Sequence, residues 1–267
     1  MSTYSKEHKL YLQKQKKEKR LVTISRLMIV ILFLVIWELL SKYNVINSFL
    51  SSRPSEVLKT IITLWQENTL FMHIGITIYE VLLSFAIATI IGFVVATILW
   101  RYEILAKIID PFLTILNSLP KVALGPLIII WVGASINSII FMSLLISTFI
   151  TIITIYQGFK KTPTTYITLL KTMNANNIQI FTKAVLPSNI PTILNALKIN
   201  ISMSLIGVIM GELLVSKSGL GYLIMYGSQV FNINMVITGV VILGIISYIM
   251  YFLVEYLENY IKRKRGL

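Results

Sequence analysis

The chain has 267 residues, of which 56% are hydrophobic and only 13% are charged, and its formal net charge is +13. A water-soluble domain carries about one-quarter charged residues, so this composition excludes an ordinary soluble globule and indicates that much of the apolar surface faces lipid. The basic residues cluster at segment ends and in the tails instead of alternating with aromatic residues, which argues against a nucleic-acid partner.

The N-terminal 26 residues are polar and carry eight lysines and arginines. The apolar segment 21–40 overlaps the end of this tail. We interpret it as a retained first span, because the basic segment is long for a signal peptide and no small-residue cleavage pattern follows Leu40. The chain is therefore divided into a basic cytoplasmic tail, residues 1–26, and a transmembrane domain, residues 27–267.

Long apolar segments recur along the rest of the chain. A helix that crosses a bilayer needs about 20 mostly apolar residues. Six segments meet this criterion, at 23–40, 74–100, 108–132, 137–157, 192–215 and 236–257. They predict an all-α polytopic membrane protein with six transmembrane helices.

The third predicted span contains several helix-breaking residues, namely Pro111, Pro120, Gly125 and Pro126. Each proline removes a backbone donor. Non-helical backbone at membrane depth is tolerated only where protein or a wet cavity satisfies the freed groups. We therefore expect a broken helix that lines a path instead of facing lipid.

The distribution of lysine and arginine predicts that both termini are cytoplasmic. With this orientation, eighteen basic residues lie in cytoplasmic segments and four lie outside: Lys42, Arg53, Lys59 and Lys217. We expect a multi-pass protein of the plasma membrane.

Two segments between spans are long enough to fold. The outer one, residues 41–73, has a helix-start signal at Pro54-Ser55-Glu56. The cytoplasmic one, residues 158–191, is amphipathic: the spacing places Ile167, Leu170 and Met173 on one face, followed by Ile178, Phe181 and Val185. Such a helix either rests on the bilayer surface or presents its apolar face to a groove of a partner.

The sequence has no motif for chemistry of its own. No glycine is followed by lysine, so there is no P-loop to hold ATP phosphates. There is no cysteine, the two histidines are His8 and His73, and the only aspartate is Asp110. We therefore expect no catalytic residue, no metal site and no cofactor.

A few charges lie within or near the spans, where each needs an explanation. Lys121 either offers a cation to a solute or reaches toward headgroups or a neighbouring carbonyl, and we favour the second interpretation. Glu80 and Lys198 lie near helix ends, and for both we expect side chains that reach the interface.

Glu212 lies near the outer end of the fifth span, after a Gly207–Gly211 pair with GxxxG spacing. This spacing predicts a helix-packing face. The glutamate is either a contact of an outer gate or an interfacial acid.

Several motifs together resemble a known family. They are Arg53-Pro54-Ser55-Glu56-Val57, Pro120-Lys121-Val122-Ala123-Leu124, Trp131-Val132-Gly133, Asn174-Ala175, Gln179-Ile180-Phe181, Val185-Leu186-Pro187, Gly211-Glu212 and Ser218-Gly219-Leu220-Gly221-Tyr222-Leu223-Ile224. This pattern resembles the permease subunits of binding-protein-dependent ABC importers of the nitrate/sulfonate/taurine type, from about residue 30 onward.

The resemblance implies a permease that works as a symmetric pair with two ATPase subunits and an extracytoplasmic solute-binding protein. It implies that the cytoplasmic loop, 158–191, is a coupling loop between helices 4 and 5. The residues that would couple to the ATPase are Thr168, Leu169, Leu170, Met173, Asn174, Ala175, Phe181, Leu186 and Pro187. Those expected at the translocation path or gate are Pro120, Lys121, Glu212, Gly219 and Gly221.

The coupling loop departs from the family pattern at two points. Thr168-Leu169-Leu170 stands where Glu-Ala-Ala is usual, and Asn174 stands where glycine is expected. Asparagine tolerates the left-handed conformation, so we still expect a helix-ending turn at 174. The missing glutamate puts in doubt the usual polar contacts with the ATPase.

The resemblance implies import of a small polar solute, such as nitrate, a sulfonate, taurine, the thiamine pyrimidine or riboflavin. The alternative is a channel or secondary carrier without an ATPase. Such carriers usually show repeated halves and buried carboxylates, and this sequence shows no repeat. A membrane scaffold without a transport role is the third possibility.

Overall fold

The computed structural model describes residues 6–43, 45–46 and 52–265, and every regular element in these ranges is a helix. The chain divides into two compact units, residues 1–63 and 64–267, which are described separately.

The first unit contains α1 (Lys6–Lys42) and most of α3 (Pro54–Gln66). The basic tail and the first apolar segment form one continuous helix in α1. Helix α3 begins at the predicted proline, and its start is held by Glu38 of α1. One carboxylate oxygen of Glu38 accepts the Ser55 backbone N–H at 3.0 Å, and the other accepts the Ser55 hydroxyl at 2.9 Å.

The predicted spans are confirmed. Five helices are long and apolar enough to cross a membrane, and a bent pair makes the sixth candidate. Beyond α1, the span elements are α4 (Leu70–Arg101), α5 (Glu103–Ser118), α6 (Gly125–Val132), α7 (Ile136–Lys160), α11 (Ile190–Val215) and α13 (Ile233–Arg265).

The bent pair is α5 and α6, which are joined by a short 3-10 helix, η1 (Lys121–Leu124), and meet at 83°. The bend follows from Pro120, because a residue before proline is pushed out of the helical region. Leu119 accordingly has extended backbone angles of −61° and 140°. Pro111 lies inside α5 without ending it. The predicted broken helix is therefore confirmed, and Pro120 is the residue that breaks it.

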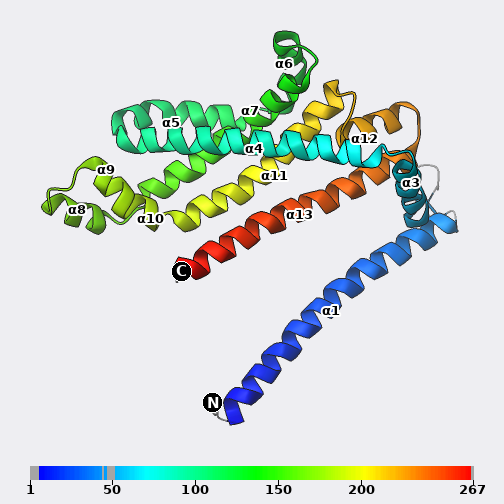
Figure 1. Cartoon of the computed structure of the whole chain (residues 1–267), viewed down its shortest axis with the longest axis horizontal. Helices are drawn as coiled ribbons and strands as arrows, with labels where there is room; N and C mark the ends of the chain where they lie inside the picture. The colour runs from blue at the N-terminus through cyan, green and yellow to red at the C-terminus, as the bar shows by residue number, and fades with distance from the viewer. Residues whose placement is uncertain (1–5, 44, 47–51, 266–267) are drawn as a thin grey trace. The chain divides into compact units, whose positions relative to one another are not determined.

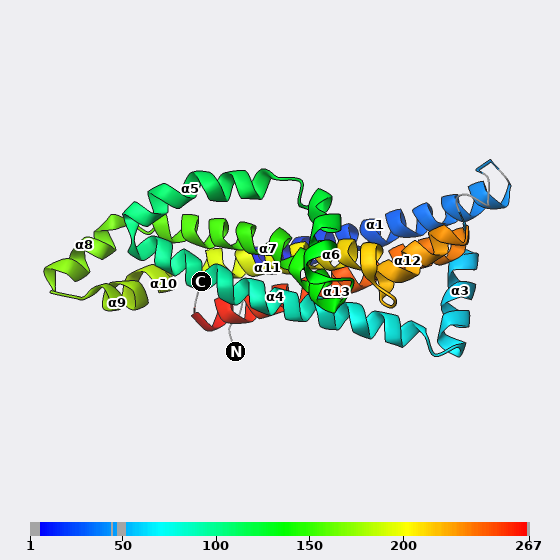
Figure 2. The same ribbon diagram turned by 90° about the horizontal axis from the view of Figure 1, so that it is seen from above.

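The core of the second unit is formed by α4, α7 and α11, which pack side by side (Figures 1 and 2). Gly207 and Gly211 of α11 face α7. A Cβ on Gly207 would run into the Ser143 backbone, and a Cβ on Gly211 would lie 2.8 Å from the Cα of Ile139. The Ser143 hydroxyl also donates to the Ser204 carbonyl at 3.0 Å. The predicted GxxxG packing face is confirmed.

Helix α4 contributes a buried face of small and polar residues spaced three or four apart. Its members include His73, Thr77, Glu80, Val81, Ser84, Ala88, Gly92, Ala96 and Leu99. Small residues let the backbones of membrane helices approach closely. The same face therefore carries both close packing and several polar groups.

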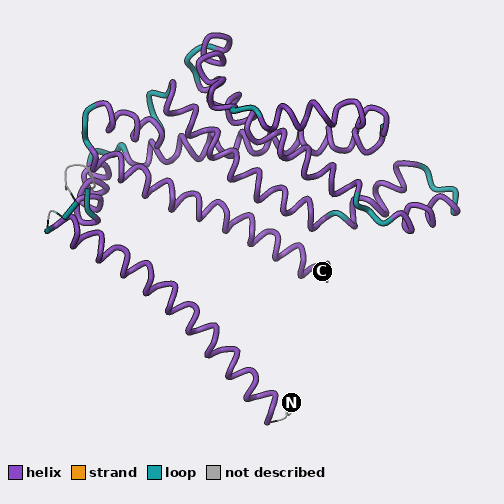
Figure 3. The backbone as a smooth tube through the Cα atoms, turned by 180° about the vertical axis from the view of Figure 1, so that it is seen from behind, coloured by secondary structure: helices purple, strands orange, loops and turns teal. Residues whose placement is uncertain are grey.

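Short helices lie at both ends of α11 (Figures 1 and 2). Between α7 and α11 the chain forms α8 (Thr164–Thr172), α9 (Asn177–Ile180), a π-helical turn η2 (Phe181–Val185) and α10 (Leu186–Ser188). Between α11 and α13 it forms α12 (Leu220–Gln229). Figure 3 shows the loops that join these short helices to the long ones.

Candidate functional site

The α8–α10 loop, residues 161–189, has an inward face that packs against the long helices. Ile180 and Val185 are buried in a cluster with Phe159 of α7 and Ala196 of α11. Four more residues of the loop pack against this cluster: Ile167, Leu170, Ala175 and Phe181. The loop is thus attached to the span helices and does not hang free.

Phe181 is the aromatic centre of this attachment. Its ring centroid lies 5.1 Å from that of Trp100 in α4 and 5.4 Å from that of Phe159 in α7, the latter edge to face. Phe159 in turn meets Phe93 of α4 at 6.1 Å. Edge-to-face aromatic pairs stabilise packing beyond the area that they bury. The loop is therefore packed against both α4 and α7 through this ring.

The apolar face predicted for the loop is partly wrong. Met173 and Ile178 are 71% and 74% exposed, whereas Phe181 and Val185 face inward. A single helical period cannot describe the segment, because the chain reverses after α8 and the π-turn inserts an extra residue into the later turn.

The reversal after α8 occurs at Asn174, which has a φ of 54°. This is the left-handed conformation predicted for it. The Ala175 N–H donates to the Leu170 carbonyl and the Asn174 N–H donates to the Lys171 carbonyl, both at 3.0 Å, which satisfies the end of the helix. A second asparagine, Asn176, caps α9 by exchanging two 2.8 Å hydrogen bonds with Gln179.

The two ends of the loop are joined by Asn189. Its buried amide donates to the Thr162 hydroxyl at 2.7 Å and to the Val185 carbonyl at 2.8 Å. At the same place Gly158 packs against Thr192 so closely that a Cβ would collide with it. The two ends of the loop are therefore held next to each other where α7 ends and α11 begins.

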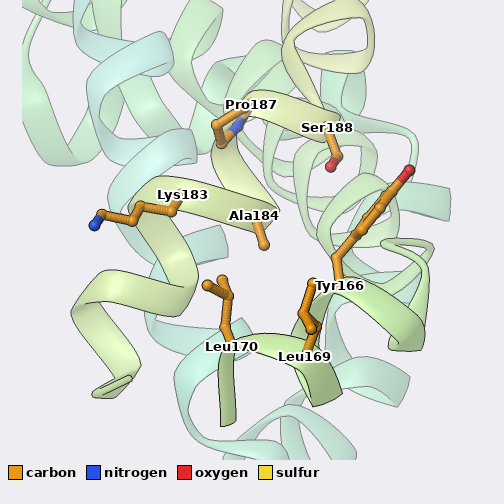
Figure 4. A pocket seen from close by; sticks show the side chains of 7 residues that line it. All are labelled: Tyr166, Leu169, Leu170, Lys183, Ala184, Pro187 and Ser188. Atoms are coloured by element: carbon orange, nitrogen blue, oxygen red, sulfur yellow. The ribbon is translucent and has the colours of Figure 1, made fainter. Parts of the chain in front are cut away.

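The outward face of the loop contains an open cleft of about 410 Å³ (Figure 4). Tyr166 and Lys183 lie at opposite sides of it, with Ala184 and the two leucines of α8 between them. The residues that line it are Tyr166, Leu169, Leu170, Lys183, Ala184, Pro187 and Ser188. Tyr166 and Leu169 are 53% and 58% exposed, so this surface is apolar and open to a partner.

The structure divides the predicted coupling residues into two groups. Leu169 and Pro187 line the cleft, Leu170 both lines it and packs against the inner cluster, and Thr168, Met173 and Asn174 are exposed. Ala175 and Phe181 pack against the inner cluster, and Leu186 is half-buried. The sequence analysis missed Tyr166 and Lys183. For Tyr166 the only signal is its position three residues before Leu169, which places both on one helix face, and Lys183 has no such signal.

Two of the predicted path residues, Pro120 and Lys121, form the break between α5 and α6. The Lys121 ammonium donates to the Asn117 carbonyl at 2.8 Å and lies 6.0 Å from the centre of the Phe149 ring of α7. Lys121 thus satisfies a carbonyl at the end of α5, as in the interpretation that the sequence favoured.

The other predicted path residues meet at the far end of α11. Glu212 is 1% exposed, and its carboxylate accepts the Thr77 hydroxyl at 2.6 Å and the Gly221 backbone N–H at 2.5 Å. Glu212 is therefore buried at the first turn of α12 and is not an interfacial acid.

Two side chains of α4 complete the cap of α12. The His73 Nδ1 accepts the Gly219 N–H at 3.0 Å, and the Thr77 hydroxyl oxygen accepts the Leu220 N–H at 2.9 Å. The first four backbone N–H groups of a helix have no partner within it. In α12 three of them, those of Gly219, Leu220 and Gly221, are satisfied by α4 and Glu212, so this short helix is fixed to both.

Gly219 has a φ of 105°, and a Cβ there would collide with the Glu212 carboxylate. A Cβ on Gly221 would lie 2.7 Å from the Cβ of Glu212. Both predicted positions therefore need glycine, because the backbone there lies too close to the Glu212 side chain for a Cβ atom. The sequence signal for the partners on α4 is the spacing of polar residues at 73, 77, 80 and 84, which places them on one helix face.

One of the two expectations for charges in the spans is wrong. Glu80 is 2% exposed within the packed face of α4 and does not reach the interface. Lys198 forms a 2.6 Å ion pair with Glu258 of α13, whose other oxygen binds Lys262 at 2.7 Å. Glu80 stays inside because it lies on the helix face that packs against α11, one turn from Thr77.

Comparison with known proteins gives consistent matches. The family model described as "Binding-protein-dependent transport system inner membrane component" matches residues 88–265. A "Probable ABC transporter permease protein" of Haemophilus influenzae is 28% identical over 231 residues, which cover 86% of this chain and 94% of that protein.

Two further relatives have named solutes. The formylaminopyrimidine transport permease protein ThiX of Halalkalibacterium halodurans is 27% identical and covers 86% of this chain and 91% of its own length. The putative aliphatic sulfonates transport permease protein SsuC of Bacillus subtilis is 24% identical, covering 95% and 92%.

Among solved structures, an inward-facing conformation of the MetNI methionine ABC transporter matches with a TM-score of 0.61 at 20% identity. The match covers 72% of this chain and 97% of that one. It shows that the two chains share a fold.

Proposed function

The chain belongs to the family of binding-protein-dependent transport system inner membrane components, and we propose that two copies of it form the pathway of an ATP-driven importer. An ABC ATPase subunit binds on the cytoplasmic side of each copy. An extracytoplasmic solute-binding protein delivers the solute to the other side.

The observation that supports this most directly is the two-sided α8–α10 loop. Its inner face is fixed to α4 and α7 through Phe181, and its outer face is an apolar cleft with exposed Tyr166 and Leu169. A loop built in this way can transmit force from a bound partner to the span helices. We infer that the cleft binds the ATPase subunit.

This assignment sets the orientation. The ATPase is cytoplasmic, so the α8–α10 end faces the cytoplasm, as the basic residues of that end also predict. Both termini are then cytoplasmic, and α12 lies at the outer end.

The solute is a small polar molecule. Relatives with named solutes are transporters of formylaminopyrimidine and of aliphatic sulfonates, and we propose that the solute belongs to these classes or to the related nitrate and taurine group. Lys121 bonds to a backbone carbonyl, and the separate binding protein is expected to select the solute. In this pathway Pro120 and Lys121 shape the bend, while Glu212, Gly219 and Gly221 hold the outer end.

The experiment is a charge placed in the cleft. Leu169→Asp should abolish co-purification of the ATPase subunit and solute-stimulated ATP hydrolysis, because Leu169 is exposed and its replacement leaves the inner packing intact. Asn177→Asp adds the same charge at an exposed position of the loop outside the cleft and should leave both unchanged. An ATPase that still binds the Leu169→Asp permease with full stimulation would show that the cleft is not the docking surface.

A further inference from the structure

Two carboxyl groups lie together in the interior between α4 and α11. Glu80 is 2% exposed and Glu212 is 1% exposed, and Glu80 lies one helical turn from Thr77, whose hydroxyl donates to the Glu212 carboxylate at 2.6 Å. The Oε2 atom of Glu80 has no hydrogen-bond partner.

Two neighbouring carboxyl groups buried without a cationic partner are strongly unfavourable if both are ionised, so one of them is expected to hold a proton. An ionised carboxylate only accepts hydrogen bonds, so a hydrogen bond between two carboxyl groups requires that one of them is protonated. The ion pairs found in the described ranges involve neither Glu80 nor Glu212. The nearby titratable groups are His73, whose Nδ1 accepts the Gly219 N–H, and Tyr222, which stacks on His73.

The surroundings of the two acids differ. Glu212 receives hydrogen bonds from the Thr77 hydroxyl and from the backbone N–H of Gly221, at the start of a helix. Oriented N–H donors at a helix N-terminus favour a negative charge. Glu80 has no such donors, so the proton of the pair belongs on Glu80.

We propose that Glu80 is a neutral acid that donates a hydrogen bond to the Glu212 carboxylate, and that Glu212 thereby acts as a positioning residue for the outer end of the transport pathway. The carboxylate then has a donor from each side: Glu80 and Thr77 of α4, and the first turn of α12. It joins α4, α11 and α12 into one body.

The consequence for transport rests on the proposed function. Helix α12 and the turn after it expose Tyr226, Val230 and Phe231, the last by 76%. These apolar side chains lie at the end where the binding protein is proposed to act. Because the start of α12 is fixed to α4 through Glu212, a force applied by a partner at these side chains would move α4 together with α12.

The first test measures the protonation directly. Difference infrared spectra of the purified full-length chain, wild type minus Glu80→Gln, should show the carbonyl band of a neutral carboxylic acid at neutral pH. The matched control Glu67→Gln removes an exposed carboxylate and should show only loss of an ionised carboxylate. Loss of a carboxylate signal alone in Glu80→Gln would overturn the proposal.

The second test compares the two acids by thermal unfolding. Glutamine can donate as a neutral acid does, so Glu80→Gln should shift the Tm by no more than about 2 °C. Glu212→Gln replaces one carboxylate oxygen, which accepts hydrogen bonds, with an NH2 group that would point at the Thr77 or Gly221 donor. The Tm of this variant should fall by about 5 °C or more. Equal effects of the two substitutions would contradict the assigned roles.

Transport assays then separate the positioning role from mere stability. In Glu212→Gln, assayed well below its Tm, we expect uptake and binding-protein-stimulated hydrolysis to fall about tenfold while ATPase binding and basal hydrolysis persist. Unchanged stimulation would overturn the positioning role. If instead the wild-type chain shows no coupled transport, the proposed function fails, while the infrared and unfolding results still decide the protonation of the pair.

Discussion

Phe181 packs against Trp100 with ring centroids 5.1 Å apart, so the π-turn of the α8–α10 loop rests on the end of α4. The predicted docking segment is therefore attached to the span helices by an aromatic contact on its inner face. This relationship gives the first of four predictions.

Phe181→Ala should uncouple the loop from the bundle. The substitution removes the contacts with Trp100 and Phe159, and truncation of a packed aromatic side chain costs about 3–5 kcal/mol when it is fully buried; the half-buried position reduces this to about 2 kcal/mol. Solute-stimulated hydrolysis in proteoliposomes should fall more than ATPase binding does. Phe181→Leu, which keeps an apolar side chain, should retain most of the stimulation, and an equal loss in both variants would contradict the aromatic role.

Gly207→Ala should disrupt the packing of α11 on α7. Its Cβ would meet the Ser143 backbone, which cannot move aside as a flexible side chain could, and overpacking costs about 1–3 kcal/mol. We expect a lower Tm and lower yield of the folded chain. Gly75→Ala is the matched control, since nothing lies within 4 Å of a Cβ there; comparable destabilisation of both variants would refute the close-packing explanation.

Gly219→Ala should be more harmful than Gly133→Ala. Both glycines have positive φ, 105° and 86°, so both substitutions strain the backbone by about 1–3 kcal/mol. Only at Gly219 does the new Cβ also collide with a side chain, the Glu212 carboxylate. Thermal unfolding of the two variants separates the effect of backbone strain from the effect of the collision. If Gly133→Ala lowered the Tm as much as Gly219→Ala, the collision with the Glu212 carboxylate would contribute nothing.

Removal of Glu258 should destabilise the chain more than removal of Lys198. Glu258→Gln leaves Lys198 and Lys262 without their shared partner, whereas in Lys198→Met the carboxylate keeps Lys262. A partner removed from a buried pair costs about 3–5 kcal/mol, and exposure lowers that figure here. The double variant should cost less than the sum of the singles. Strict additivity in denaturation experiments would mean that the 2.6 Å contact contributes nothing.

The spans were predictable because lipid imposes a simple rule on residue type and length. The break at Pro120 and the left-handed turn at Asn174 were also predictable, since each depends on the conformational limits of one residue and its neighbours. In these cases the cause lies within a few positions in the chain.

The face on which Phe181 lies was not predictable in the same way. A π-turn adds one residue to the helical repeat, and the sequence Phe181–Val185 carries no sign of it. The partners of Glu212 were hidden for a different reason: Thr77 is 135 positions away in the chain, and only the packing of α4 on α11 brings the two together. Long-range polar contacts of this kind depend on the fold as a whole.

We propose that this chain transports a solute only together with an ATPase that binds its α8–α10 loop. The most direct measurement is ATP hydrolysis by the chain co-purified with the ATPase subunit encoded beside it, with and without a candidate binding protein and its solute. We expect stoichiometric co-purification and hydrolysis that rises with the loaded binding protein. A chain that purifies without any ATPase, or that transports solute in its absence, would contradict the account.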